Sequence, residues 1–538
     1  MQWIDSLKRR VKGWMQRTAA GTGVAREYKT VFDLGGVPAF QQFYDIGVFV
    51  WKWLWRGYYK PWHLIPAPTI ENEKSTRKMY RLGMAKALCA EMAGLVWGEE
   101  CGINVTIDGR ENSNDNSDPL DAFIHDALKK NAFREKMQEL VEEALAMGGG
   151  TLKVWADVRR DRDGNEIPDT RRLMIGYGMA DQFVPTAWDN AKVTEGVFIS
   201  REAKGGFYYT RLEWHKWNGT TYIISNELYR SEMKTGDGAD NQDILGVRYP
   251  LAEIYPYLDE ETVIPVEESL FSYFRTPIAN NIDDNSPLGV SMYGNALDTL
   301  HALDICYDSF VREFRLGKKR IIVPARCVRS VVGTDGIMHR YFDATDETYE
   351  ALSTENAEDL KIHDNTIELR VEEHVAAINA FLSILCLQVG FSAGTFTFDQ
   401  HTGLKTATEV ISENSKTYKT VKTIQNQIKP AVEKLVDNLI RVAVLYEMDY
   451  EGTPVAALVA PGYHVNIVFD DGVTQDRQTN INEGITLVGA GLMSKYTFLT
   501  DPKYGQGLTE EEAKAELVRI QQESAANVNP LAIFGAGE

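Results

Sequence analysis

The feature that most constrains the fold is a long amphipathic stretch in the second half of the chain. Its apolar residues recur every three or four positions: Tyr293, Leu297, Leu300, Leu303, Tyr307, Phe310 and Phe314. Ser286-Pro287 is typical of a helix start, and Gly317 of a helix end. The pattern predicts one helix over 287–317, roughly 40 Å long at about 1.5 Å per residue. Because a compact enzyme core does not need so long a helix, we expect this one to have neighbours on its flanks.

Further helices surround this stretch. A polar segment at 318–371 contains two strand-like runs, KRIIVP and NTIELRV, and is predicted to be a small α/β insertion. Helical spacing returns at 372–390 and again from about 405 to 446. Pro430 is expected to kink the last of these helices because proline lacks a backbone donor. A strand in HVNIVFDD and small polar helices over 474–538 complete this half.

The first half has a different pattern. Helical spacing at 75–97 and 119–147 is followed, over 151–230, by short alternating runs that are typical of half-buried strands. Two dipeptides within these runs are hairpin signals, Asp163-Gly164 and Asn218-Gly219. The predicted fold class is therefore α+β, with an antiparallel meander after helices.

The composition is that of a folded protein of several domains or subdomains. The chain has 538 residues, of which 44% are hydrophobic and 25% charged. Its five cysteines contain no CxxC pair, so neither a zinc ribbon nor a disulfide framework is predicted. The basic start lacks a long apolar core and a cleavage site, so we expect no secretory signal and a location in the cytoplasm.

A stretch rich in tryptophan and tyrosine lies at 48–66, VFVWKWLWRGYYKPWHLIP. Such residues are common at membrane interfaces, but Lys52, Arg56 and Lys60 interrupt the apolar run, so it cannot span a bilayer. We expect the aromatic side chains to pack inside a domain or against another subunit, and membrane contact is disfavoured.

The net charge is −20, from 57 basic and 77 acidic residues. A protein that grips DNA tightly needs a basic surface that neutralises phosphates, so tight non-specific binding is disfavoured. The charge is compatible with contact to a DNA duplex that slides past the protein. An acidic wall repels phosphates and so offers few sites that bind them tightly.

Catalytic and metal-binding motifs are missing from the sequence. No Walker loop, HExxH, GxSxG or GxGxxG occurs, and GVSMYG at 289–294 has the wrong spacing for a nucleophile elbow. DRDGNE at 161–166 has its glycine out of register for a calcium loop, and the nine histidines have no paired ligand spacing. We therefore predict no enzyme activity, no metal and no cofactor.

Two basic groups leave alternatives open. Lys318, Lys319 and Arg320 follow a predicted helix end. Cations there interact favourably with the helix dipole. Alternatively, these residues contact a nucleic acid or a partner. A second group recurs every three residues on one helix face: Lys416, Lys419 and Lys422. This stripe is either solvated or part of a subunit interface.

The loop FSAGTFTFDQHTG at 391–403 lies between two predicted helices. Small, hydroxylated and aromatic residues of this kind suit an active-site lid, a phosphate-binding loop, a loop that enters a central hole or an ordinary surface connection.

The order of the elements resembles that of bacteriophage portal proteins, in particular the portal family of tailed phages that infect Gram-positive bacteria. Five segments also resemble that family: GMAKALCAEMAGLVW (83–97), PTAWDN (185–190), YYTRLEWH (208–215), NSPLGVSMYGNALDTLHALDICYDSFVREFRLGKKRIIVP (285–324) and TGLKTATEVISENSKTYKTV (402–421). The resemblance covers about residues 30 to 520, and the last two segments are its most specific parts.

The resemblance implies a multi-part portal fold that assembles in a cyclic ring. Its parts would be a wing of helices and a β meander (1–286), a stem helix (287–317), a clip (318–371), a second stem helix (372–390), a tunnel loop (391–404), a kinked wing helix and strand (405–472) and a helical crown (473–538).

The resemblance also implies the function. A dodecameric ring at one capsid vertex would form the channel for DNA packaging and ejection, and would bind terminase, capsid or scaffold proteins and then a head–tail adaptor. It implies a virion protein that assembles in the host cytoplasm. The clip residues Lys318, Lys319 and Arg320 would contact partners, and the tunnel loop would touch DNA weakly through Ser392, Thr395, Phe396, Thr397, Phe398, His401 and Lys405. The alternatives are another head or tail ring component and an envelope-associated protein.

Overall fold

The computed structural model confirms the α+β class. The residues it describes are 29–30, 41–67, 75–98, 101–107, 118–159, 167, 170–190, 192–233, 244–317, 320–324, 330–332, 338–340, 349–352, 363–365, 368–398, 415–469, 477–501, 504 and 513–520. The chain divides into two compact units, one formed by 1–400 with 419–470 and the other by 401–418 with 471–538.

The aromatic stretch forms α2 (Gln41–Trp55) and α3 (Lys60–His63) in the first unit. Tyr44, Trp51 and Trp62 are buried in the main core, as predicted for packing inside a domain. The core also contains the helices α4 (Met84–Val96), α5 (Pro119–Lys130) and α6 (Phe133–Met147). Within the part of the chain that is described, no helix is long and apolar enough to cross a membrane.

The predicted meander is confirmed from Phe183 onward, whereas the alternating run that begins at Thr151 belongs to a separate sheet. A seven-stranded antiparallel sheet has the order β1-β11-β10-β9-β8-β7, with β12 also paired to β10. Its strands are β1 (Lys29–Thr30), β7 (Phe183–Asp189), β8 (Lys192–Lys204), β9 (Phe207–Asn218), β10 (Thr221–Glu232), β11 (Ile244–Tyr249) and β12 (Glu261–Ile264). The hairpin at Asn218-Gly219 joins β9 to β10, and Gly219 has a φ of 62°. The other predicted hairpin, Asp163-Gly164, lies outside the described residues.

A second sheet packs on α6 and consists of β13 (Phe271–Arg275), β5 (Gly149–Asp157) and β6 (Arg172–Met179). A buried ion cluster joins it to the large sheet. Lys153 of β5 donates to both carboxylate oxygens of Glu213 on β9, at 2.8 and 2.7 Å, and Arg211 and His215 also contact Glu213. Burial lowers the pKa of Lys153, whereas the charge of Lys153, the hydrogen bond with His215 and the charge of Arg211 together hold the pKa of Glu213 well below its usual value.

Helix α5 differs from the prediction, which joined it to α6 in one helix. The described chain breaks at Asn131 and Ala132, and Ala132 has a φ of 47°, which a continuous helix does not allow. Two hydrogen bonds explain the break: the Asn131 side chain donates to the Leu173 carbonyl at 2.9 Å and accepts from the Ile175 amide at 3.0 Å. A tertiary contact with β6 thus overrides the local periodicity.

The long helix α7 begins later than predicted, because it comprises Leu297–Leu316. Residues 286–291 instead form a segment that is neither helix nor strand, followed by a turn from Met292, and its backbone bonds to distant parts of the core. Met292 donates to the Leu145 carbonyl at 2.9 Å, and Val290 accepts from the Thr276 hydroxyl at 2.6 Å. A Cβ at Gly289 would overlap the carbonyl of Gly148, so the two backbones approach as only glycine permits. Ser286-Pro287 therefore does not start a helix.

Short strands follow α7 in the insertion at 318–371. The described ones are β14 (Arg320–Pro324), β15 (Ser330–Val332), β16 (Met338–Arg340), β17 (Tyr349–Leu352) and β18 (His363–Asn365). β14 pairs in parallel with β17 and antiparallel with β18. The strand predicted in KRIIVP is confirmed by β14, whereas the run NTIELRV contributes only its first residue to β18.

The remaining helices of the second half are largely as predicted. α8 is Val371–Val389, and α10 is Ser415–Leu445 with Pro430 inside it. β21 (Tyr463–Val468) pairs antiparallel with β4 (Gly102–Ile107), so a strand from the second half of the chain joins one from the first half. The other short elements of the first unit are β2 (Leu64–Pro66), β3 (Thr76–Lys78), β19 (Asp449–Tyr450), β20 (Thr453–Pro454) and α11 (Val455–Val459). The second unit includes α12 (Arg477–Gly489), α13 (Lys495–Thr500) and a short helix at 513–520.

Candidate functional site

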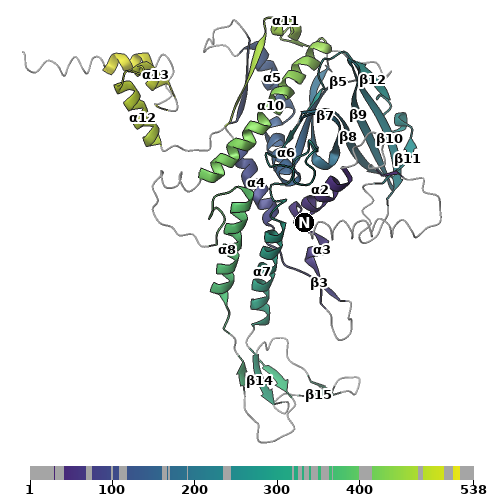
Figure 1. Cartoon of the computed structure of the whole chain (residues 1–538), viewed down its shortest axis with the longest axis vertical. Coiled ribbons are helices and arrows are strands. Elements are labelled where there is room, and N and C mark those ends of the chain that lie inside the picture. The colour runs from purple at the N-terminus through teal and green to yellow at the C-terminus, as the bar shows by residue number, and fades with distance from the viewer. Residues whose placement is uncertain are drawn as a thin grey trace, which may run out of the picture. The chain divides into compact units, whose positions relative to one another are not determined.

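The candidate functional region consists of α7, α8 and the loop that follows α8. Figure 1 shows the two helices side by side, with the insertion that carries β14 and β15 between them in the sequence. Their facing sides contribute to the core through Leu300, Leu303, Ile378, Leu382 and Leu385, all less than a tenth exposed. The pair therefore belongs to one continuous packed structure rather than to a separate arm.

An ion pair joins the C-terminal end of α7 to the N-terminal end of α8. Arg370 donates to Glu313 through Nε at 3.1 Å and through Nη2 at 2.9 Å. The ring of His374 lies 5.6 Å from that of Phe310, centroid to centroid. The hydrogen bonds from Arg370 lower the pKa of Glu313 to about 2. Residues 310–316 and 370–374 consequently lie at the same level along the helix pair.

Several large apolar side chains on these helices remain exposed: Ile305, Phe314 and Leu316 on α7, and Val371, Ile384 and Leu387 on α8. Leu387 is 53% exposed although Leu385 and Cys386 beside it are buried. α8 is thus apolar on its inner and its outer side. A helix of this kind is normally covered all round, so the outer side is suited to contact with another chain.

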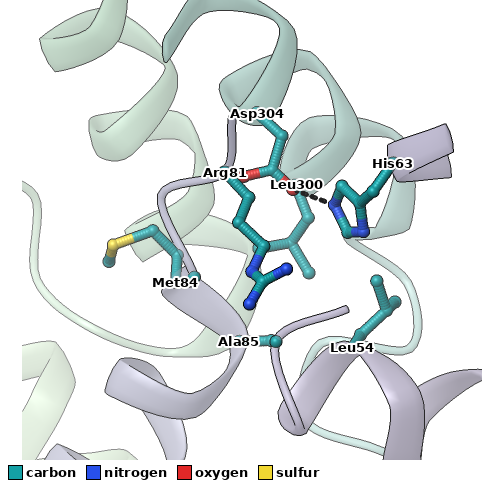
Figure 2. Close-up of a pocket in the computed structure, with 9 residues that line it drawn as sticks. Leu54, His63, Arg81, Met84, Ala85, Leu300 and Asp304 are labelled. Atoms are coloured by element: carbon teal, nitrogen blue, oxygen red, sulfur yellow. Dashed lines mark hydrogen bonds and ion pairs between the residues drawn. The ribbon is translucent and has the colours of Figure 1, made fainter. Parts of the chain in front are cut away.

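A buried carboxylate on α7 anchors the helix pair to the core. Asp304 accepts from the backbone amide of Leu82 at 2.8 Å, and its other oxygen lies 3.0 Å from Nε2 of His63 (Figure 2). Nδ1 of His63 accepts from the Tyr59 amide at 2.8 Å, so the proton of the neutral ring is on Nε2, which donates to Asp304. The cavity beside this contact, about 10 Å³, has room for one water at most and is no ligand site.

A second carboxylate lies one turn further along α7. Asp308 accepts two hydrogen bonds from the guanidinium of Arg77, at 2.8 and 2.6 Å, and one from the Tyr80 amide at 3.0 Å. The hydrogen bond from Arg77 lowers the pKa of Asp308. Asp308 is 5% exposed, so this bidentate pair is largely shielded from water and fixes the position of β3 on α7.

A pocket of about 380 Å³ opens beside this pair. Six residues line it: the basic Arg77, Lys78, Arg312 and Arg315, together with Tyr80 and Leu316. Arg77 is neutralised by Asp308, whereas Arg315 donates to the neutral hydroxyl of Tyr80 at 2.8 Å. We call this site the basic pocket. Its charge suits an anionic group.

The loop after α8 has a defined conformation in its first half. Gly390, with a φ of 93°, ends the helix, and its carbonyl accepts from the Thr420 hydroxyl of α10 at 2.8 Å. Thr395 donates to the Ser392 carbonyl at 2.8 Å, which closes a tight turn. The rings of Phe391 and Phe396 meet edge to face with centroids 5.4 Å apart. The loop is thus folded against its own base.

The predicted loop residues differ in exposure. Thr395, Thr397 and Phe398 are exposed, and Phe398 is 54% exposed. Phe396 is half-buried, and Ser392 is buried at 3% exposure, so its hydroxyl does not lie on the outer surface of the loop. The Phe398 amide donates to Asn379 of α8 at 3.0 Å. The chain therefore offers two hydroxyls and one ring outward.

The other residues singled out in the sequence are only partly described. Lys318, Lys319, His401 and Lys405 lie outside the described residues, and Arg320 begins β14, where it pairs with Asn365. The basic stripe falls on α10, where Lys416 is half-buried and Lys419 and Lys422 are exposed.

Sequence reasoning missed the basic pocket and the two buried carboxylates. A signal was present, because Asp304 and Asp308 stand four residues apart next to Leu303 and Tyr307 of the apolar stripe. Acidic residues on a buried helix face need partners. Their partners His63 and Arg77 lie more than 200 residues earlier, so spacing could not identify them. Among the described residues, no group of three or more His, Cys, Asp or Glu side chains could hold a metal ion.

The chain thus combines a helix pair with exposed apolar residues, an insertion of short strands between the helices and a folded loop after them, and its exposed apolar surfaces suit contact with other chains. The family model described as phage portal protein, SPP1 Gp6-like, matches residues 54–529, and the chain belongs to that family. It is accordingly a structural component of a phage virion. None of the curated proteins compared with the chain matches it.

Proposed function

We propose that the chain forms a dodecameric ring at one vertex of the capsid and that DNA enters and leaves through the ring. Terminase would bind it during packaging and a head–tail adaptor afterwards, with capsid or scaffold proteins around it. The protein would assemble in the host cytoplasm and have no enzyme activity. Membership of the portal family supports this role.

The observation that carries the ring is the outer side of α8. Ile384 and Leu387 are 45% and 53% exposed and stand three residues apart, so they form one apolar patch on the helix surface. Because a ring closes through a head-to-tail contact that each copy repeats, such a patch would be covered by the next copy.

Native mass spectrometry and electron microscopy of the purified chain test the ring. We expect a closed ring with a central hole. Ile384→Ser/Leu387→Ser should reduce ring formation, whereas Val263→Ser, at a residue of β12 that is 59% exposed, should not. A wild-type chain that remains monomeric at every concentration would contradict the proposal.

The loop at 391–404 would form the narrow part of the channel. Its outward groups in the described part are the Thr395 and Thr397 hydroxyls and the Phe398 ring, and none of them is charged. Duplex DNA carries one phosphate charge per about 1.7 Å of its axis, so a loop of this composition would not hold it ionically. Ser392 would support the loop from inside.

The insertion at 318–371 would bind terminase and then the adaptor. Lys318, Lys319 and Arg320 are proposed as contact residues because they are consecutive cations where the insertion begins. Replacing all three with alanine should leave the rings intact and abolish packaging of DNA in an assay with terminase and procapsids. Normal packaging by this variant would count against the assignment.

A further inference from the structure

The basic pocket has more positive charge than its own neighbours neutralise. Of its four basic residues, Arg77 forms the ion pair with Asp308, and Arg315 donates to the neutral Tyr80. Lys78 and Arg315 are exposed, and Arg312 is half-buried. Leu316, 57% exposed, adds an apolar wall. The pocket therefore suits an acidic partner that also brings an apolar side chain.

The first turn of α8 has this composition. Glu372 and Glu373 are exposed, and Val371 beside them is 37% exposed. We call residues 371–373 the acidic turn. Carboxylates at a helix N-terminus also interact favourably with the helix dipole. That interaction explains the two charges of the acidic turn but not the exposure of Val371.

The pocket and the acidic turn lie at the same level of the helix pair but on different sides of it. Glu313 faces Arg370 of α8, and residues of an α-helix turn by about 100° each. Arg312 and Arg315 are thereby directed away from the chain's own α8. By the same reasoning Glu372 is directed away from α7, since His374 faces Phe310.

We propose that the acidic turn of one copy of this chain binds in the basic pocket of the next copy. The inference rests on the proposed ring, because a rotation about an axis along the helices brings two sites at the same level together in every copy. Glu372 and Glu373 would meet Arg312 and Arg315, and Val371 would cover Leu316. The apolar residue on both surfaces favours a protein partner over a nucleic-acid phosphate.

Two charge-reversal variants test the contact. The first changes the pocket, Arg312→Glu/Arg315→Glu, and the second changes the acidic turn, Glu372→Lys/Glu373→Lys. In the first variant an acidic pocket would meet an acidic turn, and in the second a basic pocket would meet a basic turn. Either variant alone therefore places like charges together at every contact, so the fraction of chain in rings should fall by about tenfold or more. Native mass spectrometry measures that fraction. A matched control, Lys204→Glu/Arg248→Glu, reverses two exposed cations of the seven-stranded sheet and should leave ring formation unchanged.

Mixing the two variants in equal amounts should restore the rings. In a ring with an even number of subunits the variants can alternate, and every pocket then faces a turn of opposite charge. Restoration requires that both variants fold and that the two sites meet. If the mixture stays below a tenth of the wild-type ring fraction, the proposal is overturned.

Other results separate this inference from the ring itself. If each variant alone forms rings as the wild type does, the pocket contact is wrong but the ring stands. If the wild-type chain forms no ring, both fail. If the pocket variant forms normal rings but no longer binds a short duplex DNA that the wild type binds, the pocket is a nucleic-acid site and the proposal is overturned.

Discussion

The middle and the C-terminal end of α7 contain the same chemistry in different surroundings. Near its middle, Asp308 pairs with Arg77, and the two side chains are 7% and 26% exposed. At its C-terminal end, Glu313 pairs with Arg370, and these are 16% and 66% exposed. Both are bidentate contacts between an arginine and a carboxylate in one chain. Burial is what distinguishes them.

This difference assigns the two regions different roles. Water screens the outer pair, so holding it together contributes little to stability. The inner pair cannot lose one partner without leaving the other poorly solvated, so it fixes α7 against β3. The outer end also exposes Phe314 and Leu316, whereas Leu300 and Leu303 further back are buried. The part of α7 up to Asp308 is thus fixed to the core, whereas its C-terminal end has an exposed surface that is available to partners.

The largest effect is expected from the same substitution made in both regions. Leu303→Asp buries a carboxylate at a residue with no exposure, so we expect a loss of about 4 kcal/mol or more in the free energy of unfolding, and no rings. Leu316→Asp, at a residue 57% exposed, should change that free energy by about 0.5 kcal/mol or less. Urea unfolding followed by tryptophan fluorescence measures both. Equal losses would remove the distinction between anchor and open end.

A smaller effect is expected when the buried pair is neutralised. Asp308→Asn removes the charge that Arg77 binds and directs an amide group toward a guanidinium. Arg77 keeps about a quarter of its side chain exposed, so the cost should be nearer 2 kcal/mol than the larger values of fully buried pairs. The same unfolding measurement applies. A variant as stable as wild type would mean that Arg77 does not depend on Asp308.

The elements that sequence alone predicts correctly are those whose signal is local. α8 was predicted over 372–390 and is Val371–Val389, because its apolar spacing and the closing Gly390 are within one segment. The meander was predicted for the same reason, since alternation and a turn dipeptide identify β9 and β10.

The errors arise where distant residues decide the structure. Ser286-Pro287 has the local form of a helix start, but hydrogen bonds from Met292 to Leu145 and from Thr276 to Val290 hold the segment in a non-helical conformation. The loop position was predictable from its composition, whereas the burial of Ser392 depends on packing that no pattern records. The basic pocket combines α7 with β3, more than 200 residues apart, and was beyond sequence reasoning.

Acid should remove the contribution of both pairs, so the difference between them should be seen near neutral pH. Arg370 lowers the pKa of Glu313 to about 2, from an ordinary value of 4.5, so any stability from the pair is present above about pH 4.5 and is lost as the pH falls toward 2. Asp308 has the same sign, because its pKa is also lowered from 3.8. Glu313→Gln should therefore match wild type in acid and differ from it only slightly at pH 7, by less than Asp308→Asn does. Urea unfolding at pH 2, 5 and 7 gives the comparison, and a larger loss for Glu313→Gln at pH 7 would reverse the assignment of anchor and open end.

The smallest effect on stability is expected in the loop, where the effect on DNA should be the largest. Thr397 is exposed, and its hydroxyl donates to Asn379 across a long distance of 3.4 Å, so Thr397→Trp should leave the fold and the rings unchanged. One tryptophan from every copy would narrow the proposed channel, so we expect impaired packaging or retention of DNA. Thr221→Trp makes the same change at an exposed residue of β10 and should package normally, which controls for the added indole. Packaging by Thr397→Trp at the wild-type rate, or a ring map with this side chain on the outer surface, would exclude the loop from the channel.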